Sequence, residues 1–305
     1  MKILITGGLG HIGSYLISRL VKIKKIKKIY LIDNIGNQRF NVLFKLKNEK
    51  IKFIYGDLTN KAIIKKLPKT NIVLHLASLT NAEKSLTEKQ HVISNNMGCF
   101  KNIVIYCKRN KVKLIHISST SVYGSQKNTV DETEKKLAPQ SPYAEIKLKE
   151  ENMLKKQKKI SYISLRFGTI SGYSEGMRFH TAVNKFCFNA IMNIKIPIWG
   201  QALNLYRPYL SLKDANKVIN YIIQKNYFPC EIFNIISENK TVLQILNLIK
   251  KEKIKIKIRF VKGKILQQNS FMTSGEKIKR LGLKLDSKIA SDIRETLKKI
   301  KISSL

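Results

Sequence analysis

A glycine-rich turn near the start of the chain limits the possible folds more than any other feature of this sequence. The segment Thr6-Gly7-Gly8-Leu9-Gly10-His11-Ile12-Gly13 directly follows an apolar run and directly precedes an amphipathic stretch. Glycines at these spacings allow a sharp turn and a close approach of a pyrophosphate to the backbone, and the last glycine lets a helix pack on the strand. The segment therefore predicts a strand–turn–helix unit that binds a dinucleotide. A purely structural glycine turn would give the same local pattern.

Short β-branched runs alternate with helical patterns through the first half of the chain. This alternation is typical of βαβ units, in which helices cover both faces of a parallel sheet. We expect strands at Ile3–Thr6, Ile29–Asp33, Lys52–Gly56, Ile72–Ala77, Lys113–Ser118 and Tyr162–Phe167, and helices at His11–Val21, Ser85–Lys108 and Ser141–Gln157. The sequence thus predicts an α/β fold built on a Rossmann-type, doubly wound parallel sheet.

The pattern changes after Phe167, where a turn-rich stretch begins. We expect helices at Phe179–Met192, Ala215–Ile223 (with Asp214 as its N-cap) and Val242–Lys250, strands at Pro197–Gly200, Ile232–Ile236 and Lys255–Val261, and two small helices at the end. Residues 1–168 would form the dinucleotide-binding domain, to which 203–236 would return. Residues 169–202 and 237–305 would form a smaller substrate-binding lobe.

Asp33 strengthens the prediction of a dinucleotide site, because it ends the second predicted strand twenty residues after Gly13. A carboxylate there accepts hydrogen bonds from the adenosine ribose hydroxyls and would repel a 2′-phosphate. No arginine stands beside Asp33 in the sequence, so we expect NAD rather than NADP; the alternative is a turn or capping role. The other candidate cofactor contacts are Gly7, Gly10, His11, Ile12, Gly13, Asn34, Asp57, Leu58 and Ala77.

Ser119, Tyr143 and Lys147 carry the functional groups of a proton-transfer site. Tyr143 and Lys147 stand four residues apart, so they lie on the same face of a predicted helix. The positive charge of Lys147 favours a phenolate, which would take a proton from a sugar hydroxyl as hydride leaves the same carbon. Ser119 would hydrogen-bond that oxygen. Chance pairs of this kind are common in a lysine-rich chain, but the glycine turn and the place of Ser119 at a strand end favour the catalytic interpretation.

Together these motifs resemble the extended short-chain dehydrogenase/reductase superfamily, specifically its NAD-dependent sugar-nucleotide epimerase/dehydratase branch, which includes the UDP-glucose 4-epimerases. The resemblance covers nearly the whole chain. It rests on Thr6–Gly13, Asp33-Asn34, Gly56-Asp57-Leu58, His75-Leu76-Ala77, Asn95 with Gly98, Ser118–Gly124, Ser141–Lys147, Leu165–Gly172, and Arg207-Pro208-Tyr209 followed by Asp214-Ala215.

The resemblance implies a function and roles for single residues. Ser119, Tyr143 and Lys147 correspond to the catalytic triad of the family, and Lys147 would also hold the nicotinamide ribose. Arg207 matches a position that contacts the nucleotide diphosphate, and Arg178 falls in a segment of the substrate lobe. The implied function is a sugar-nucleotide epimerase that works with tightly held NAD through a keto-sugar. An NAD-dependent sugar-nucleotide oxidoreductase or decarboxylase would share the first step.

Two departures from the family pattern bear on the reaction. Thr120 and Ser121 stand where the 4,6-dehydratases of the family carry an Asp-Glu pair for elimination, which argues against dehydratase chemistry. Thr169 stands where UDP-glucose 4-epimerases have Asn, and it remains a candidate substrate contact. These departures leave the identity of the sugar and of the nucleotide open.

The formal net charge of +38 raises the alternative of nucleic-acid binding. The cations are mostly lysines spread along the chain, whereas arginine makes the better bidentate contacts with phosphates and bases. Lys, Ile and Asn share A/T-rich codons, so a compositional bias explains their abundance together. We expect no specific nucleic-acid partner; a non-catalytic RNA-binding or nucleotide-sugar-sensing protein is the distant alternative.

Composition also limits location, metal binding and assembly. No apolar run is long enough to cross a bilayer and the N-terminus does not read as a signal peptide, so we expect a cytoplasmic protein without a membrane partner. The cysteines lack metal-ligand spacing, which predicts buried reduced thiols and no metal site.

The predicted helices Ser85–Lys108 and Ser141–Gln157 correspond to helices that pair in dimers of the family, with Ile103, Ile105 and Tyr106 as an apolar stripe. We therefore expect a homodimer.

Overall fold

The computed structural model describes residues 1–36, 39–81, 84–261 and 270–303 of the 305-residue chain. Its centre is a sheet of seven parallel strands in the order β10-β6-β5-β4-β1-β2-β3. The strands are β1 (Lys2–Thr6), β2 (Lys28–Asp33), β3 (Ile51–Tyr55), β4 (Ile72–His75), β5 (Lys113–Ser119), β6 (Tyr162–Phe167) and β10 (Glu231–Ile235). This arrangement confirms the predicted Rossmann-type α/β fold.

Helices cover both faces of this sheet because successive strand residues point to opposite sides. Ile3 and Ile5 of β1 belong to one apolar core, which also includes residues of α1 (His11–Leu20) and α8 (Leu212–Lys225). Leu4 belongs to a second core, together with residues of α5. The helices whose residues enter this second core are α3 (Lys61–Lys66), α5 (Lys89–Asn110) and α6 (Pro142–Lys155).

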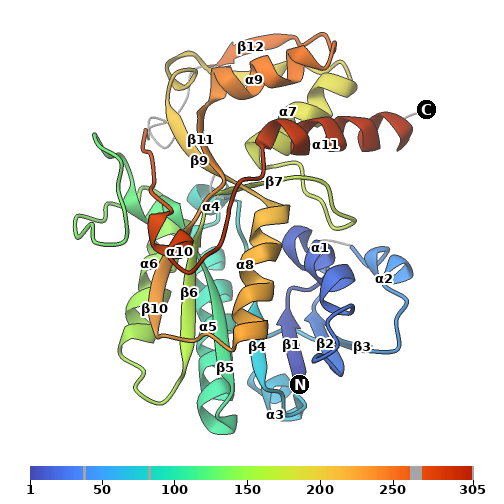
Figure 1. Ribbon diagram of the computed structural model, residues 1–305, viewed down its shortest axis with the longest axis vertical. Coiled ribbons are helices and arrows are strands. Elements are labelled where there is room, and N and C mark those ends of the chain that lie inside the picture. Colours follow the sequence, from blue (N-terminus) through green and yellow to red (C-terminus); the bar gives the residue numbers. More distant parts are fainter. Residues whose placement is uncertain (37–38, 82–83, 262–269, 304–305) are drawn as a thin grey trace.

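A smaller part of the molecule lies above the carboxyl ends of the large sheet (Figure 1). Its strands form two small sheets, β11-β9-β7 and β12-β8, and its helices share a third apolar core. Its elements are β7 (Thr169–Ser171), α7 (Ala182–Ile191), β8 (Ile196–Trp199), η2 (Gly200–Ala202), β9 (Tyr206–Ser211), β11 (Glu238–Thr241), α9 (Val242–Lys251), β12 (Ile258–Val261) and α11 (Ile289–Ser303). The remaining short helices are α2 (Val42–Lys45), α4 (Lys84–Thr87), η1 (Thr120–Tyr123) and α10 (Glu276–Lys279).

Several local predictions were wrong. The predicted helix at Ser85–Lys108 is divided into α4 and α5, and the second of the two small C-terminal helices is the fifteen-residue α11. Asp214 does not cap α8: Ser211 does, with its Oγ accepting a hydrogen bond from the Lys213 N–H at 3.2 Å. Asp214 instead lies inside the first turn, where its buried carboxylate accepts hydrogen bonds from the hydroxyls of Ser237 and Ser287. Asp214 was predicted as the N-cap because it stands next to the helix start in the sequence, and that position alone does not reveal partners as distant as Ser237 and Ser287.

The cysteines differ in part from the prediction of buried thiols. Cys99, Cys107 and Cys187 are buried and reduced, but Cys230 is exposed. Cys230 adopts a left-handed backbone conformation just before β10, with φ of 61°, at the surface end of that strand. The division of the chain into 1–168 with 203–236, and 169–202 with 237–305, remains a prediction, although α8 and β10 do pack with the large sheet.

Candidate active site

One cavity of about 1050 Å³ runs along the carboxyl ends of β1, β2, β4 and β5 and reaches the smaller part of the molecule. Every candidate site residue of the sequence analysis lines it, although these residues come from distant segments. They are Gly7, Gly10, His11, Ile12, Gly13, Asp33, Asn34, Asp57, Leu58, Ala77, Ser119, Tyr143, Lys147, Thr169, Arg178 and Arg207. Ligands of open α/β sheets bind at this edge, so the location suits a dinucleotide.

The glycine turn has the geometry that a bound pyrophosphate needs. Gly7 has φ of +63°, and a Cβ there would lie 2.8 Å from the backbone of Ala77. A Cβ at Gly13 would lie 2.5 Å from the carbonyl oxygen of Gly8. Gly10 caps α1 without a side-chain hydrogen bond, so the first N–H groups of the helix are left for an anionic ligand. The residues present therefore fit NAD.

Asp33 stands at the end of β2 as predicted, but it has more neighbours than the sequence indicated. Its carboxylate accepts hydrogen bonds from the backbone N–H groups of Leu9 at 3.2 Å and Ile35 at 2.9 Å. Burial lowers the pKa of Arg39, and the nearby charge of Asp33 partly opposes that effect. The inference that no arginine stands beside Asp33 is therefore wrong in three dimensions, because the Arg39 guanidinium lies close to both Asp33 and Gly10 of the glycine turn.

The residues of the proposed triad are held by two helix starts. Ser119 ends β5 and caps η1, and its Oγ accepts hydrogen bonds from the N–H of Ser121 at 3.2 Å and from the Ser121 hydroxyl at 2.8 Å. Tyr143 lies in the first turn of α6, where the Ser141 hydroxyl oxygen accepts from the Ala144 N–H. Lys147 follows one turn later, and its Nζ lies 5.8 Å from the centre of the Tyr143 ring.

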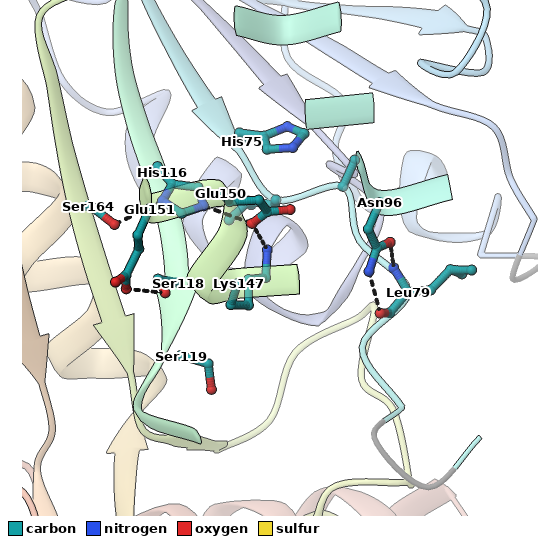
Figure 2. Close-up of polar contacts among 12 residues, drawn as sticks. His75, Leu79, Asn96, His116, Ser118, Ser119, Lys147, Glu150, Glu151 and Ser164 are labelled. Atoms are coloured by element: carbon teal, nitrogen blue, oxygen red, sulfur yellow. Dashed lines mark hydrogen bonds and ion pairs between the residues drawn. The ribbon is translucent and has the colours of Figure 1, made fainter. Parts of the chain in front are cut away.

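Lys147 is buried, and its charge is compensated by a neighbour that the sequence analysis missed. Its Nζ donates to Oε2 of Glu150 at 2.8 Å, and the same oxygen lies 2.9 Å from Nε2 of His116 (Figure 2). Burial opposes the charge of Lys147, but Glu150, with smaller contributions from Tyr143 and Glu151, outweighs burial and raises the pKa of the lysine above its ordinary value. Burial likewise opposes ionisation of Glu150, but Lys147 and His116 outweigh it and lower the Glu150 pKa to about 2.

The next carboxylate on α6 belongs to a separate buried group. Glu151 makes two hydrogen bonds with Arg166 of β6, at 2.9 and 2.7 Å, and accepts a third from the Ser118 hydroxyl at 2.6 Å. The Arg166 guanidinium lies 4.8 Å from the centre of the Tyr123 ring. Paired in this way, the buried charges of Glu151 and Arg166 join α6 to the sheet.

Two arginines supply positive charge on the side of the cavity where the sequence analysis placed the substrate. Arg178 is half-buried, hydrogen-bonds the Thr80 hydroxyl, and has no ion pair among the described residues. Burial of its guanidinium lowers the pKa of Arg178 to about 10. Burial also lowers the pKa of Arg207 to about 10, and its guanidinium lies 5.9 Å from the centre of the Phe271 ring. Because both guanidinium groups are largely shielded from water, they favour the binding of an anionic ligand.

The segment after β7 closes directly onto the glycine turn. His11 Nε2 donates to the carbonyl oxygen of Gly172 at 2.8 Å, and the Ser174 hydroxyl donates to the carbonyl oxygen of His11 at 2.8 Å. The Gly176 N–H donates to the Ser14 hydroxyl at 2.9 Å. Burial lowers the pKa of His11 to about 3, so its ring is neutral at pH 7. These bonds couple the smaller part of the molecule to the predicted cofactor site.

Comparison with known proteins identifies the family. The sequence model of the NAD dependent epimerase/dehydratase family matches residues 3–235, which is more than half of the chain. The chain belongs to this family. An uncharacterised UDP-glucose epimerase of Bacillus subtilis is 29% identical over 262 residues, covering 82% of this chain and 81% of that protein. An uncharacterised protein of Methanocaldococcus jannaschii is 30% identical over 91% of this chain and 90% of its own length.

Solved structures agree with this membership. The UDP-glucuronic acid 4-epimerase of Bacillus cereus, in complex with UDP-glucuronic acid and NAD, superposes with a TM-score of 0.90 at 24% identity, covering 99% of this chain and all of that one. The UDP-N-acetylglucosamine 4-epimerase of Methanobrevibacter ruminantium superposes with a TM-score of 0.87 at 25% identity, covering 100% of this chain and 99% of that one. The predictions of an NAD-dependent enzyme, of the family and of its fold are thus confirmed.

Two further observations concern metals and membranes. Within 1–36, 39–81, 84–261 and 270–303, no three His, Cys, Asp or Glu side chains gather in a way that would hold a metal ion. No helix in those ranges is both long and apolar enough to span a bilayer.

Proposed function

We propose that this enzyme inverts the configuration of a sugar carbon, C4 by analogy with its relatives, in a nucleoside-diphosphate sugar. The observation that supports it most is the meeting of Ser119, Tyr143 and Lys147 with the glycine turn around a single cavity. When bound, NAD supplies a reversible hydride acceptor. Three of the four named relatives are described as epimerases of UDP-sugars, which agrees with this reaction.

The chain's own residues handle the proton of the sugar hydroxyl. Tyr143, as phenolate, takes this proton while the carbon loses its hydride, and a ketone forms. Ser119 donates its hydroxyl hydrogen to the same sugar oxygen; its Oγ already accepts from Ser121, which leaves that hydrogen for a ligand. Lys147 keeps a positive charge close to the phenolate. Once the keto-sugar has turned over in the cavity, Tyr143 returns the proton to the oxygen of the inverted centre.

The surroundings of Ser119 favour epimerisation over dehydration. Elimination of water needs an acid and a base beside the sugar, which the dehydratases of the family supply as an Asp-Glu pair. Here the equivalent Thr120 is buried, with its hydroxyl donating to the Phe167 carbonyl oxygen at 3.3 Å. Ser121 is occupied by its bond to Ser119. Neither side chain is a proton donor or acceptor of the required strength.

For the substrate, we assign the nucleotide diphosphate to Arg207 and the sugar to Ser119, Thr169 and Arg178. Arg178 is close enough to Tyr143 for their charges to interact, so it borders the reacting end of the ligand. A partly buried cation at that end, without an ion pair among the described residues, favours a sugar that carries an acidic group, such as the uronic acid bound by the Bacillus cereus relative.

Ligand analysis tests this proposal. Mass spectrometry of small molecules released from denatured purified protein should detect NAD, together with any retained sugar nucleotide. Turnover of UDP-glucose, UDP-N-acetylglucosamine and UDP-glucuronic acid should then be compared by NMR of the products. We expect inversion at C4, fastest with the uronic acid. Protein that neither contains nor binds NAD would refute the proposed function, whereas equal rates would remove only the preference for an acidic sugar.

We also propose a homodimer in the cytoplasm. Helices α5 and α6 pack side by side on one face of the large sheet. Ile105 of α5 has 53% of its surface exposed. A second copy of the same helices would cover it.

A further inference from the structure

A chain of buried hydrogen bonds stands directly behind Lys147. Glu150 Oε2 lies 2.8 Å from Lys147 Nζ and 2.9 Å from His116 Nε2, and His116 Nδ1 lies 2.8 Å from the hydroxyl of Ser164 (Figure 2). Glu150 and His116 are 1% and 0% exposed. Lys147 borders the cavity, but Glu150, His116 and Ser164 are not among its lining residues. Of these four hydrogen-bonded residues, only Lys147 borders the cavity.

The chemistry of Glu150 fixes the protons along this chain. An ionised carboxylate only accepts hydrogen bonds, so the imidazole carries its hydrogen on Nε2 and donates it to Glu150. In the neutral ring Nδ1 then accepts a hydrogen bond from the Ser164 hydroxyl, 2.8 Å away. The arrangement holds one carboxylate oxygen between two donors from different elements, α6 and β5. One ammonium hydrogen of Lys147 is used there, and its other hydrogens remain for the cavity side.

The other ionisable groups around Lys147 do not take the place of Glu150. They are Tyr143 and Glu151 on α6, His75 on β4 and Cys99 on α5. Burial lowers the pKa of His75 to about 3 and raises the pKa of Cys99 to about 12, so both are neutral at pH 7. Glu151 is already bound by Arg166 and Ser118. Among the described residues, Glu150 is therefore the only carboxylate in contact with the lysine.

We propose that Glu150 is a positioning residue of this active site, whose carboxylate, oriented by His116, keeps Lys147 charged and in place beside Tyr143. A buried lysine without a counter-charge readily loses its proton, and positively charged nicotinamide nearby would add to that tendency. The neutral amine would no longer favour the phenolate of Tyr143. The proposal rests on the proposed role of Tyr143 as the base.

Replacing Glu150 with glutamine removes two influences on Tyr143 that have opposite signs. Loss of the negative charge of Glu150 by itself would make the phenolate easier to form. Loss of the proton from Lys147 would make it harder to form. Lys147 and Tyr143 both border the cavity, whereas Glu150 lies behind the lysine, so the second effect dominates. The expected result is that phenolate formation requires a higher pH.

An ultraviolet titration of the NAD complex, without any sugar, tests the proposal directly. The absorbance of the Tyr143 phenolate is obtained by subtracting the titration of the same protein carrying Tyr143→Phe from that of each protein. In Glu150→Gln the phenolate should form about one pH unit or more above the wild type. Glu151→Gln is the matched control, because it makes the same change to an equally buried carboxylate one residue away. It should leave the titration within about 0.3 units of the wild type, since Glu151 contacts Arg166 rather than Lys147.

A second comparison separates action through Lys147 from a direct effect on Tyr143. In a Lys147→Met background, Glu150→Gln should no longer move the phenolate to higher pH. If Glu150→Gln is too unstable to study, His116→Gln is expected to shift the titration in the same direction but less, because it removes the ring that donates to Glu150.

The possible outcomes distinguish this inference from the proposed function. An unchanged or lowered phenolate titration in Glu150→Gln, or an equal rise in Glu151→Gln, would overturn the role of Glu150 and leave Tyr143 as the base. A wild-type NAD complex in which Tyr143 keeps its proton at neutral pH would instead overturn the role of Tyr143 as the base, on which this inference depends.

Discussion

At the scale of single residues, this site depends on charges that are buried in pairs. Lys147 with Glu150 and Arg166 with Glu151 all lie within the protein, and each cation has a carboxylate at 2.7 or 2.8 Å. An unpaired charge in such surroundings would be strongly destabilising, so both pairs must form together. Arg178 has no such partner among the described residues, which is consistent with a ligand that supplies the anion.

Tyr143→Phe should reduce turnover by at least about a hundredfold while leaving NAD binding unchanged. The substitution removes the phenol oxygen and keeps the ring. Steady-state rates with a sugar nucleotide, together with NAD dissociation constants, measure both effects. Retention of more than a few per cent of the wild-type rate would mean that another group moves the proton.

Asp33→Ala should weaken NAD binding and reduce the preference for NAD over NADP. The carboxylate is the group that would bind the ribose hydroxyls, and without it Arg39 would face a 2′-phosphate unopposed. The ratio of the dissociation constants for NAD and NADP measures this preference. Because Asp33 also accepts hydrogen bonds from Leu9 and Ile35, thermal unfolding of the variant serves as the control. An unchanged ratio would assign Asp33 a purely structural role.

At the scale of elements, the sequence predicted the parts that depend on local pattern. The strands of the large sheet, the glycine turn and the Tyr143–Lys147 helix face all appear where periodicity and turn chemistry placed them. Glu150 was missed because a glutamate within a lysine-rich helix looks like a solvent-exposed residue. Only its packing against His116 of β5 shows otherwise. Likewise β9 was not predicted, because it is stabilised by pairing with β7 and β11, far away in sequence.

The C-terminal helix α11 supplies a pH-dependent contact. Asp292 accepts hydrogen bonds from Ser171 of β7 and Ser211 of β9, and burial raises its pKa to about 6 despite these bonds. In the unfolded chain this group titrates near pH 4. The raised pKa of Asp292 therefore stabilises the folded protein fully below about pH 4, and this stabilisation is lost as pH rises through 6.

Asp292→Asn should remove this pH dependence. Between pH 4.5 and 7 the free energy of unfolding of the wild type should fall by about 2 kcal/mol relative to that of the variant. Urea unfolding of both proteins at the two pH values measures the difference. If the difference in the free energy of unfolding between the two proteins does not vary with pH, folding does not shift the pKa of Asp292.

At the scale of the whole molecule, charge and assembly must be considered together. Two chains of +38 repel each other, although salt screens exposed charges beyond about 8 Å at physiological strength. The expected apolar stripe on α5 is smaller than the sequence indicated, because Ile103 and Tyr106 are buried in the protein's own core and Ile105 alone of the three is exposed.

The proposed homodimer should strengthen as salt rises from low to physiological concentration. Sedimentation equilibrium at two salt concentrations measures this. Ile105→Lys should weaken the dimer, whereas Ile194→Lys, at a similarly exposed isoleucine on a different part of the surface, should not. A wild-type protein that is monomeric at both salt concentrations would contradict the dimer.

The central claim is that the enzyme inverts a sugar carbon by removing and returning the same hydride. Its most direct test uses a UDP-sugar with deuterium at C4, incubated with the enzyme and NAD and followed by proton NMR. We predict a C4-inverted product that keeps its deuterium, with no net consumption of NAD. Loss of the deuterium to solvent, or NADH formed in proportion to an oxidised sugar, would contradict the account.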